Sequence, residues 1–282
     1  MGRESVAAVL VLVAGGATLF LCGAWRASPA RSVGGRALER EQWLRLWTPF
    51  IVPVLAFAGV LGWAIQEPPR SDESVTTGLA MLATVPAAIV ARAMARAIRS
   101  LVPSDALHAP ALTVGLLRPR ILVAPELSTS LDSAAARAAW EHESAHALHH
   151  DPLRIWVAQF ATDLLWPLPA AFDRFRAWLY ALEVARDEEA RGRGVDGADL
   201  AAAVIEAARL QRRRAGKRSA ALIGDGERLR ERITRLLSPL PQDSDGPRFH
   251  LALALLGGAV ILAVLGSFYG DSIVRALPGI VT

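Results

Sequence analysis

The chain has 282 residues, 52% of them hydrophobic, and a formal net charge of +4. Its composition is too apolar for an ordinary soluble domain, and its length suffices for a membrane part plus one soluble domain. The single cysteine, Cys22, excludes an intrachain disulfide and a cysteine-rich metal site. Almost all the positive charge is arginine at the edges of apolar runs. This pattern fits membrane orientation better than nucleic-acid binding, so we expect a lipid bilayer but no nucleic acid as a direct partner.

Four apolar runs predict membrane-spanning helices, at residues 6–25, 46–65, 75–91 and 251–269. About 20 apolar residues are enough to cross a bilayer core of about 30 Å. The loop after the first run is rich in arginine, whereas the loop after the second carries Arg70 against three acidic residues. The positive-inside rule therefore places the first loop in the cytoplasm, the second outside, and residues from about 100 onward in the cytoplasm. Both termini are then extracytoplasmic.

This topology divides the chain into three regions. Residues 1–100 form a three-span transmembrane region, residues 101–247 a cytoplasmic domain, and residues 248–282 a final transmembrane helix with a short extracytoplasmic tail. The cytoplasmic region has the usual size of one domain.

The cytoplasmic region begins with two short β-branched segments, at residues 111–115 and 120–124, which predict strands or a hairpin. An alanine-rich helix follows from Asp132 to about His150, where Pro152 blocks its continuation. Residues 155–168 fit either a buried helix or one that dips into the membrane interface. Further helices are expected at 170–191 and 201–210, an exposed arginine-rich loop near anionic lipid at 211–218, and an apolar core stripe through Leu229, Ile233, Leu236 and Leu237.

The helix expected at 132–150 contains an H-E-x-x-H pattern, from His142 to His146. Two residues four apart lie on the same face of a helix, so both imidazoles can reach a single Zn²⁺ ion. Glu143 points to the neighbouring sector, where it can act as a base on water. The pattern predicts His142 and His146 as metal ligands and Glu143 as the catalytic residue.

A catalytic zinc takes a third protein ligand, and Glu183 is the best candidate. Asp187 lies four residues further on, so both carboxylates project from one face of a later helix, and one can bind metal while the other orients a histidine. A surface helix with solvated charge pairs is the alternative. His149 and His150 compete for the third position, although three ligands along one straight helix are too spread out to converge.

Several other polar residues have open roles at this stage. Asp151 either orients a ligand or terminates the helix. Tyr180, Arg186 and His108 are each able to stabilise an oxyanion, and the sequence gives no basis for choosing among them.

The chain resembles the BlaR/MecR-type membrane metallopeptidases. Residues 115–123, GLLRPRILV, are similar to the G-L-x-x-P-x-I strand signature of that family, and His142 to Asp151 matches H-E-x-x-H-x-x-x-x-D. Glu183 and Asp187 match E-x-x-x-D, and residues 230–237 resemble its R-I-x-x-L-L element. The resemblance covers about residues 108–240 together with the pattern of three spans before and one after.

The resemblance implies a mainly α membrane protein with about four transmembrane helices and a cytoplasmic α+β gluzincin-type zinc metallopeptidase domain inserted between the third and fourth. His142, His146 and Glu183 would bind Zn²⁺, Glu143 would be the general base, and Asp187 and Asp151 would support the ligands. The strand residues Arg120, Ile121, Leu122 and Val123 would hold an extended substrate by main-chain pairing. The implied substrate is a cytoplasmic transcriptional repressor, or the chain itself, in a signalling pathway.

Two departures from the family pattern stand out. Ser144 stands on the expected zinc helix where the family usually has a larger apolar residue, a change expected to loosen the packing behind that helix. Because about thirteen residues follow the last apolar run, we expect no extracellular sensor domain and no β-lactam trigger. Two alternatives remain: an HtpX/CAAX-type membrane protease in quality control, and a non-catalytic membrane signalling or scaffold protein.

Overall fold

The computed structural model describes residues 34–66, 77–101, 110–215 and 223–241. The chain is mainly helical within these ranges, as predicted, and its strands form one antiparallel hairpin. The elements are α2 (Gly35–Gln66), α3 (Thr77–Arg99), β1 (Ala111–Val114), β2 (Arg120–Val123), α4 (Pro125–Ser130), α5 (Ser133–Leu148), α6 (Asp151–Leu164), α7 (Pro169–Gly192), α8 (Gly197–Ala215) and α9 (Ile223–Leu237).

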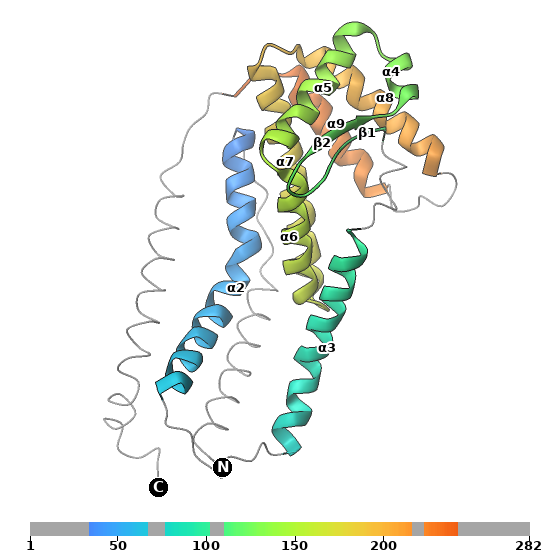
Figure 1. Cartoon of the computed structure of the whole chain (residues 1–282). Coiled ribbons are helices and arrows are strands. Elements are labelled where there is room, and N and C mark those ends of the chain that lie inside the picture. The colour runs from blue at the N-terminus through green and yellow to red at the C-terminus, as the bar shows by residue number, and fades with distance from the viewer. Residues whose placement is uncertain (1–33, 67–76, 102–109, 216–222, 242–282) are drawn as a thin grey trace.

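The molecule has a helical head from which long helices extend in one direction (Figure 1). The hairpin, α4, α5, α8 and α9 gather in the head, and α2 and α3 run away from it. α2 packs along α7, and α3 packs along α6. Helices α6 and α7 therefore connect the head to the two long helices.

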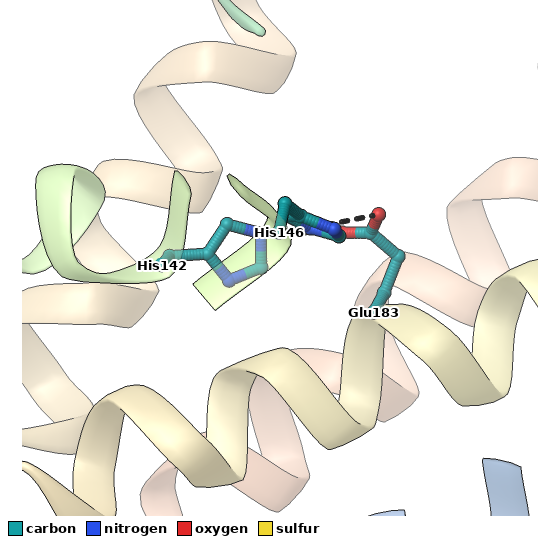
Figure 2. Close-up of side chains that lie close together, drawn as sticks. All are labelled: His142, His146 and Glu183. Atoms are coloured by element: carbon teal, nitrogen blue, oxygen red, sulfur yellow. Dashed lines mark hydrogen bonds and ion pairs between the residues drawn. The ribbon is translucent and has the colours of Figure 1, made fainter. Parts of the chain in front are cut away.

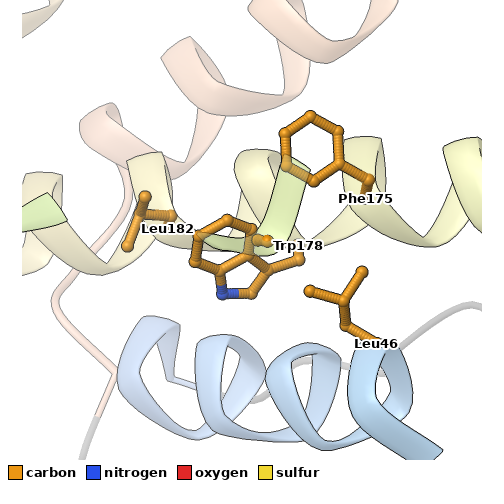
Figure 3. Close-up of a cluster of buried hydrophobic side chains, with 5 residues drawn as sticks. Leu46, Phe175, Trp178 and Leu182 are labelled. Carbon is orange, nitrogen blue, oxygen red and sulfur yellow. The ribbon is translucent and has the colours of Figure 1, made fainter. Parts of the chain in front are cut away.

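The interface between α2 and α7 is an aromatic and aliphatic core. Trp178 of α7 is fully buried and packs with Leu46 of α2 and with Phe175 and Leu182 of its own helix (Figure 3). The Trp43 ring lies 4.9 Å from the Trp178 ring, centroid to centroid. Leu46, the first residue of the second predicted span, thus belongs to a core shared with α7.

A second core joins α5, α7, α8 and α9 in the head. It is built mostly from small side chains, which allow helices to approach closely: Ala138, Ala190, Leu200, Ala201 and Leu236. The predicted apolar stripe on α9 is right for Leu236, which is buried, and wrong for Leu237, which is 64% exposed. Leu237 is the last residue of α9, so the stripe ends with the helix.

The β1–β2 hairpin pairs Ala111 with Val123 and Val114 with Arg120. Its turn requires glycine, because Gly115 has a φ of +96° and a Cβ there would lie 2.6 Å from the carbonyl oxygen of Arg118. The hairpin predicted for residues 111–124 is confirmed.

Two helices differ in extent from the sequence prediction. The helix expected at residues 155–168 is α6, which begins earlier, at Asp151, and ends earlier, at Leu164. It packs against α3 and α7, with Ala158, Ala161 and Asp163 buried. α8 continues to Ala215, so the arginines predicted to lie in a loop, Arg212 to Arg214, are helical. Arginine is a good helix former and its charge is favourable in a last turn, which explains the extension.

Within the ranges that the structure describes, no helix has both the length and the apolar composition of a membrane span. The first and fourth predicted spans, 6–25 and 251–269, lie outside these ranges. The second falls on α2, and the third falls mostly on α3. The four-span topology stays a prediction.

Replacing Gly197 with alanine is expected to destabilise the fold by about 1–3 kcal/mol. A Cβ at this first residue of α8 would lie 2.0 Å from the backbone oxygen of Leu236, so α9 would have to shift. The free energy of unfolding in denaturant measures the effect. Gly192→Ala is the matched control, because nothing lies within 4 Å of its Cβ position. Equal effects of the two changes would contradict the close approach of α8 and α9.

Candidate metal centre

Helix α5 presents both histidines of the H-E-x-x-H pattern on one face. It begins after Asp132, whose side chain caps the helix by accepting a hydrogen bond of 2.8 Å from the Ala135 backbone amide. It ends at Leu148, and His150 then adopts a left-handed conformation with a φ of +52° before α6 starts. His142 and His146 are both buried on the inner face of α5.

Glu183 reaches from α7 toward the two histidines (Figure 2). The Nε2 atoms of His142 and His146 are 3.1 Å apart. The Glu183 carboxylate lies 3.5 Å from His142 Nε2 and 3.6 Å from His146 Nε2. The structure therefore brings together the three residues that the sequence suggested as ligands.

The spacing of these atoms suits a tetrahedral ion. Two ligands about 2.0–2.1 Å from a tetrahedral Zn²⁺ lie about 3.3 Å from each other. The two Nε2 atoms are 3.1 Å apart, and Glu183 lies 3.5 Å from His142 through Oε2 and 3.6 Å from His146 through Oε1, so each separation is close to that value. Two imidazole nitrogens and one carboxylate are also a donor set that zinc accepts in catalytic sites.

Each histidine has a carboxylate behind it. His142 Nδ1 lies 2.9 Å from Asp187 Oδ1, and His146 Nδ1 lies 2.9 Å from Asp151 Oδ2. The His146 contact is a hydrogen bond, whereas Asp187 lies at ion-pair distance from His142 Nδ1 without meeting hydrogen-bond geometry. A carboxylate hydrogen-bonded to Nδ1 holds that nitrogen as N–H and leaves the Nε2 lone pair for a metal. Asp187 and Asp151 are therefore placed to set the tautomer and the orientation of the two rings.

Asp151 is fully buried and is neutralised by arginines. Arg186, itself buried, donates to both of its oxygens, at 2.5 and 3.1 Å, and Arg154 donates at 2.9 Å. Burial would raise the pKa of Asp151, but the hydrogen bonds from His146 and Arg186 hold it well below its usual range. Arg154 also pairs with Glu39 on α2, so an ion-pair chain runs from α2 to His146 through Arg154 and Asp151.

Arg232 of α9 is a component of the site that sequence reasoning missed. Its guanidinium donates to both oxygens of Asp187, at 2.6 and 2.8 Å, and its Nη1 lies 2.8 Å from Glu183 Oε2. It thus links the two carboxylates of α7 to α9. The only sequence signal was its position in the segment 230–237 that carries part of the family resemblance.

The charges at the centre shift its pKa values. Burial would lower the pKa of His142, but the Asp187 and Glu183 carboxylates outweigh burial and raise it to about 9. Burial would raise the pKa of Glu183, but Arg232 and the histidines hold it well below its usual range. The pKa of Asp187 is lowered against burial by the same arginine and by His142. Without a metal, His142 thus carries a proton that metal binding must displace.

Glu143 is buried beside the histidines and is held by β1. The Thr113 hydroxyl lies 2.8 Å from Glu143 Oε2 and 3.0 Å from the Glu143 backbone oxygen. The carboxylate lines the same cavity as the two histidines and Glu183. It is therefore within the cavity where a base would meet water and substrate.

The cavity has a volume of about 620 Å³ and lies among α5, α7, α8, α9 and β1. Ala111, Leu112 and Thr113 of β1 line it, whereas its described lining includes none of the predicted substrate-pairing residues of β2, Arg120 to Val123. Substrate pairing along Arg120 to Val123 stays a prediction, and β1 is the strand whose residues border the cavity.

The remaining sequence candidates fall into different places. His149 pairs with Glu189 at 2.8 Å and is 41% exposed, and His150 is exposed at the junction of α5 and α6, so neither reaches the centre.

The three candidates for oxyanion stabilisation are in different positions. Tyr180 lines the cavity, and burial followed by the Glu231 carboxylate raises its pKa. Arg186, engaged by Asp151, is not part of the described lining, and His108 lies outside the described residues. Ser144 is half-buried on α5.

Replacing Asp187 with asparagine is expected to weaken zinc binding by about 10–100-fold, because His142 loses the carboxylate that orients it. Competition with a chromophoric chelator measures the affinity. Asp173→Asn on the same helix is the control, since Asp173 is exposed. Unchanged zinc affinity in the Asp187 variant would mean that the ring is oriented by other contacts.

A family model described as BlaR1 peptidase M56 matches residues 39–236. The match covers more than half of the chain, runs from α2 to α9, and includes every residue of the metal centre. Comparisons with curated proteins and with solved structures give no match.

Proposed function

Because the chain belongs to the BlaR1 peptidase M56 family, we propose that it is an integral membrane zinc endopeptidase that hydrolyses peptide bonds of a cytoplasmic protein. The observation that supports this most directly is the convergence of His142, His146 and Glu183 at spacings that suit a tetrahedral ion. The arginine distribution between the apolar runs supports a cytoplasmic position for the peptidase part.

His142, His146 and Glu183 would hold the zinc, and Asp187 and Asp151 would orient the two rings. A zinc ion bound by three protein ligands polarises a carbonyl oxygen and lowers the pKa of water toward neutrality. The chain's own groups hold these side chains in place: Arg232 binds Asp187 and Glu183, and Thr113 fixes Glu143.

Glu143 acts as the general base. Its carboxylate takes a proton from the water whose oxygen attacks the scissile carbonyl carbon, and it then delivers that proton to the leaving nitrogen as the C–N bond breaks. The hydrogen bond from Thr113 orients the carboxylate toward the cavity during both transfers.

The substrate binds as an extended chain along β1. One edge of β1 pairs with β2, and Ala111, Leu112 and Thr113 border the cavity. Main-chain pairing accepts many sequences and leaves selectivity to side-chain pockets. This fits a protein substrate, either a cytoplasmic transcriptional repressor or a second segment of this chain, cleaved in a signalling pathway.

The test is metal analysis and proteolysis by the purified full-length chain. About one zinc per chain is expected, with cleavage of added protein or of the chain itself detected by mass spectrometry. A chelator should abolish cleavage and added zinc should restore it. Saturating zinc at about 100 times its Kd should also raise stability by about 2.7 kcal/mol, visible as a higher Tm. Absence of stoichiometric zinc would favour the non-catalytic scaffold instead.

A further inference from the structure

Three arginines from three different helices line the outer part of the cavity: Arg176 of α7, Arg212 of α8 and Arg228 of α9. All three are exposed. Arg228 donates a hydrogen bond of 3.2 Å to the backbone oxygen of Arg176, so these two lie together. Among the residues described by the structure, no carboxylate forms an ion pair with any of them. We call these three residues the arginine rim.

The acidic groups of the cavity do not neutralise the arginine rim, because they already have partners. Asp151 is paired with Arg186 and Arg154, and Glu183 is paired with Arg232. Glu143 is bound by the Thr113 hydroxyl. The carboxylates beside the metal-binding residues thus have partners of their own, whereas the described residues offer the arginine rim no carboxylate partner. A bound Zn²⁺ would add further positive charge to the cavity.

The wall near the arginine rim is apolar. Ala207 and Ala208 of α8, Leu229 of α9 and Leu179 of α7 line the cavity close to the three arginines. A concave surface of this kind accepts aliphatic peptide side chains and desolvates charges beside it, which strengthens their interaction. The planar guanidinium group pairs with carboxylates in bidentate geometry.

We propose that the arginine rim selects substrates with acidic side chains close to the scissile bond. The inference rests on the proposed peptidase function, and it adds the substrate class: acidic peptide segments. Arg176, Arg212 and Arg228 determine specificity, whereas His142, Glu143, His146 and Glu183 carry the hydrolysis. Base stacking is not available to a nucleic acid here, because the described lining holds one aromatic residue, Tyr180.

Peptide binding to the full-length Glu143→Gln protein in detergent with zinc tests this. Three fluorescent peptides share one core and differ only in the flanking residues, which are glutamate, glutamine or lysine. The glutamate peptide should bind about tenfold more tightly than the glutamine peptide at low salt, and the preference should fall as salt rises. The lysine peptide should bind most weakly.

Charge-reversal variants assign the effect to the arginine rim. The double change Arg212→Glu and Arg228→Glu should remove the preference for the glutamate peptide. Arg230→Glu is the matched control, because Arg230 is exposed on α9 and is not among the residues that line the cavity. Equal binding of the glutamate and glutamine peptides would overturn the proposal. So would a preference that survives the double change, or one that Arg230→Glu removes equally well.

Two further measurements separate the outcomes. If anionic vesicles displace the glutamate peptide and bind with higher affinity, the arginine rim is a lipid headgroup site and the proposal is overturned. Cleavage of the three peptides by the unmodified protein is measured in parallel. If none is cleaved but the glutamate peptide binds through the arginine rim, the peptidase function fails while the acidic selectivity stands.

Discussion

Replacing Glu143 with glutamine is expected to reduce peptide hydrolysis by about a thousandfold while zinc binding is retained. Glutamine has nearly the same shape and still accepts the Thr113 hydrogen bond, but it cannot take a proton from water. The ligand atoms of His142, His146 and Glu183 are untouched. Single-turnover cleavage and metal content, measured on the same preparation, check the two halves of this expectation.

Thr113→Val is a milder change that tests the same general-base role. It removes the hydroxyl that holds Glu143 but leaves the carboxylate, so we expect a smaller loss of rate, about tenfold, with zinc still bound. If the Glu143→Gln protein cleaved as fast as the unmodified protein, the general-base role would be wrong. A loss of zinc from the Glu143 variant would instead show that this residue supports the metal.

Replacing Asp151 with asparagine is the second change with a large expected effect. Arg186 is 2% exposed and would lose its main carboxylate partner, leaving a buried charge poorly compensated. Breaking a buried pair in this way costs about 3–5 kcal/mol. We expect the low end, about 3 kcal/mol, because Glu189 still lies 3.3 Å from Arg186. Unfolding in denaturant with the metal removed measures it.

The same pair predicts a pH dependence of stability. The pKa of Asp151 is depressed in the folded chain, so its contribution is complete above its unfolded value of about 3.9 and is lost as pH falls toward the folded value. The Asp151→Asn protein should lack this part of the acid destabilisation, whereas Asp173→Asn, at an exposed position, should retain it. If the unmodified protein and both variants lost stability equally as pH falls, the pKa of Asp151 would not be depressed.

Local periodicity carried most of the prediction of the metal centre. A spacing of four on α5 and again on α7 placed His142 with His146 and Glu183 with Asp187, because helical geometry fixes which residues share a face. The contact between α5 and α7 at these four residues belongs to the tertiary structure. Periodicity within each helix cannot supply it, and the family resemblance supplied the expectation instead.

The features that the sequence left undetermined depend on contacts between distant elements. Arg232 is one of several arginines on a strongly amphipathic helix, and only the approach of α9 to α7 distinguishes it from Arg228 and Arg230. Similarly, the hairpin was predicted, but which of its strands borders the cavity depends on how the sheet sits on α5. The end of α8 was placed too early because an arginine run was interpreted as a loop.

The ion pairs from Glu39 through Arg154 and Asp151 to His146 make the position of α2 and the affinity for metal thermodynamically linked. If a movement of α2 breaks the pair with Arg154, the free energy of metal binding changes through His146. The linkage is reciprocal, so a bound metal resists that same movement by an equal amount. A helix that begins more than a hundred residues before the metal ligands thus contributes to the free energy of metal binding.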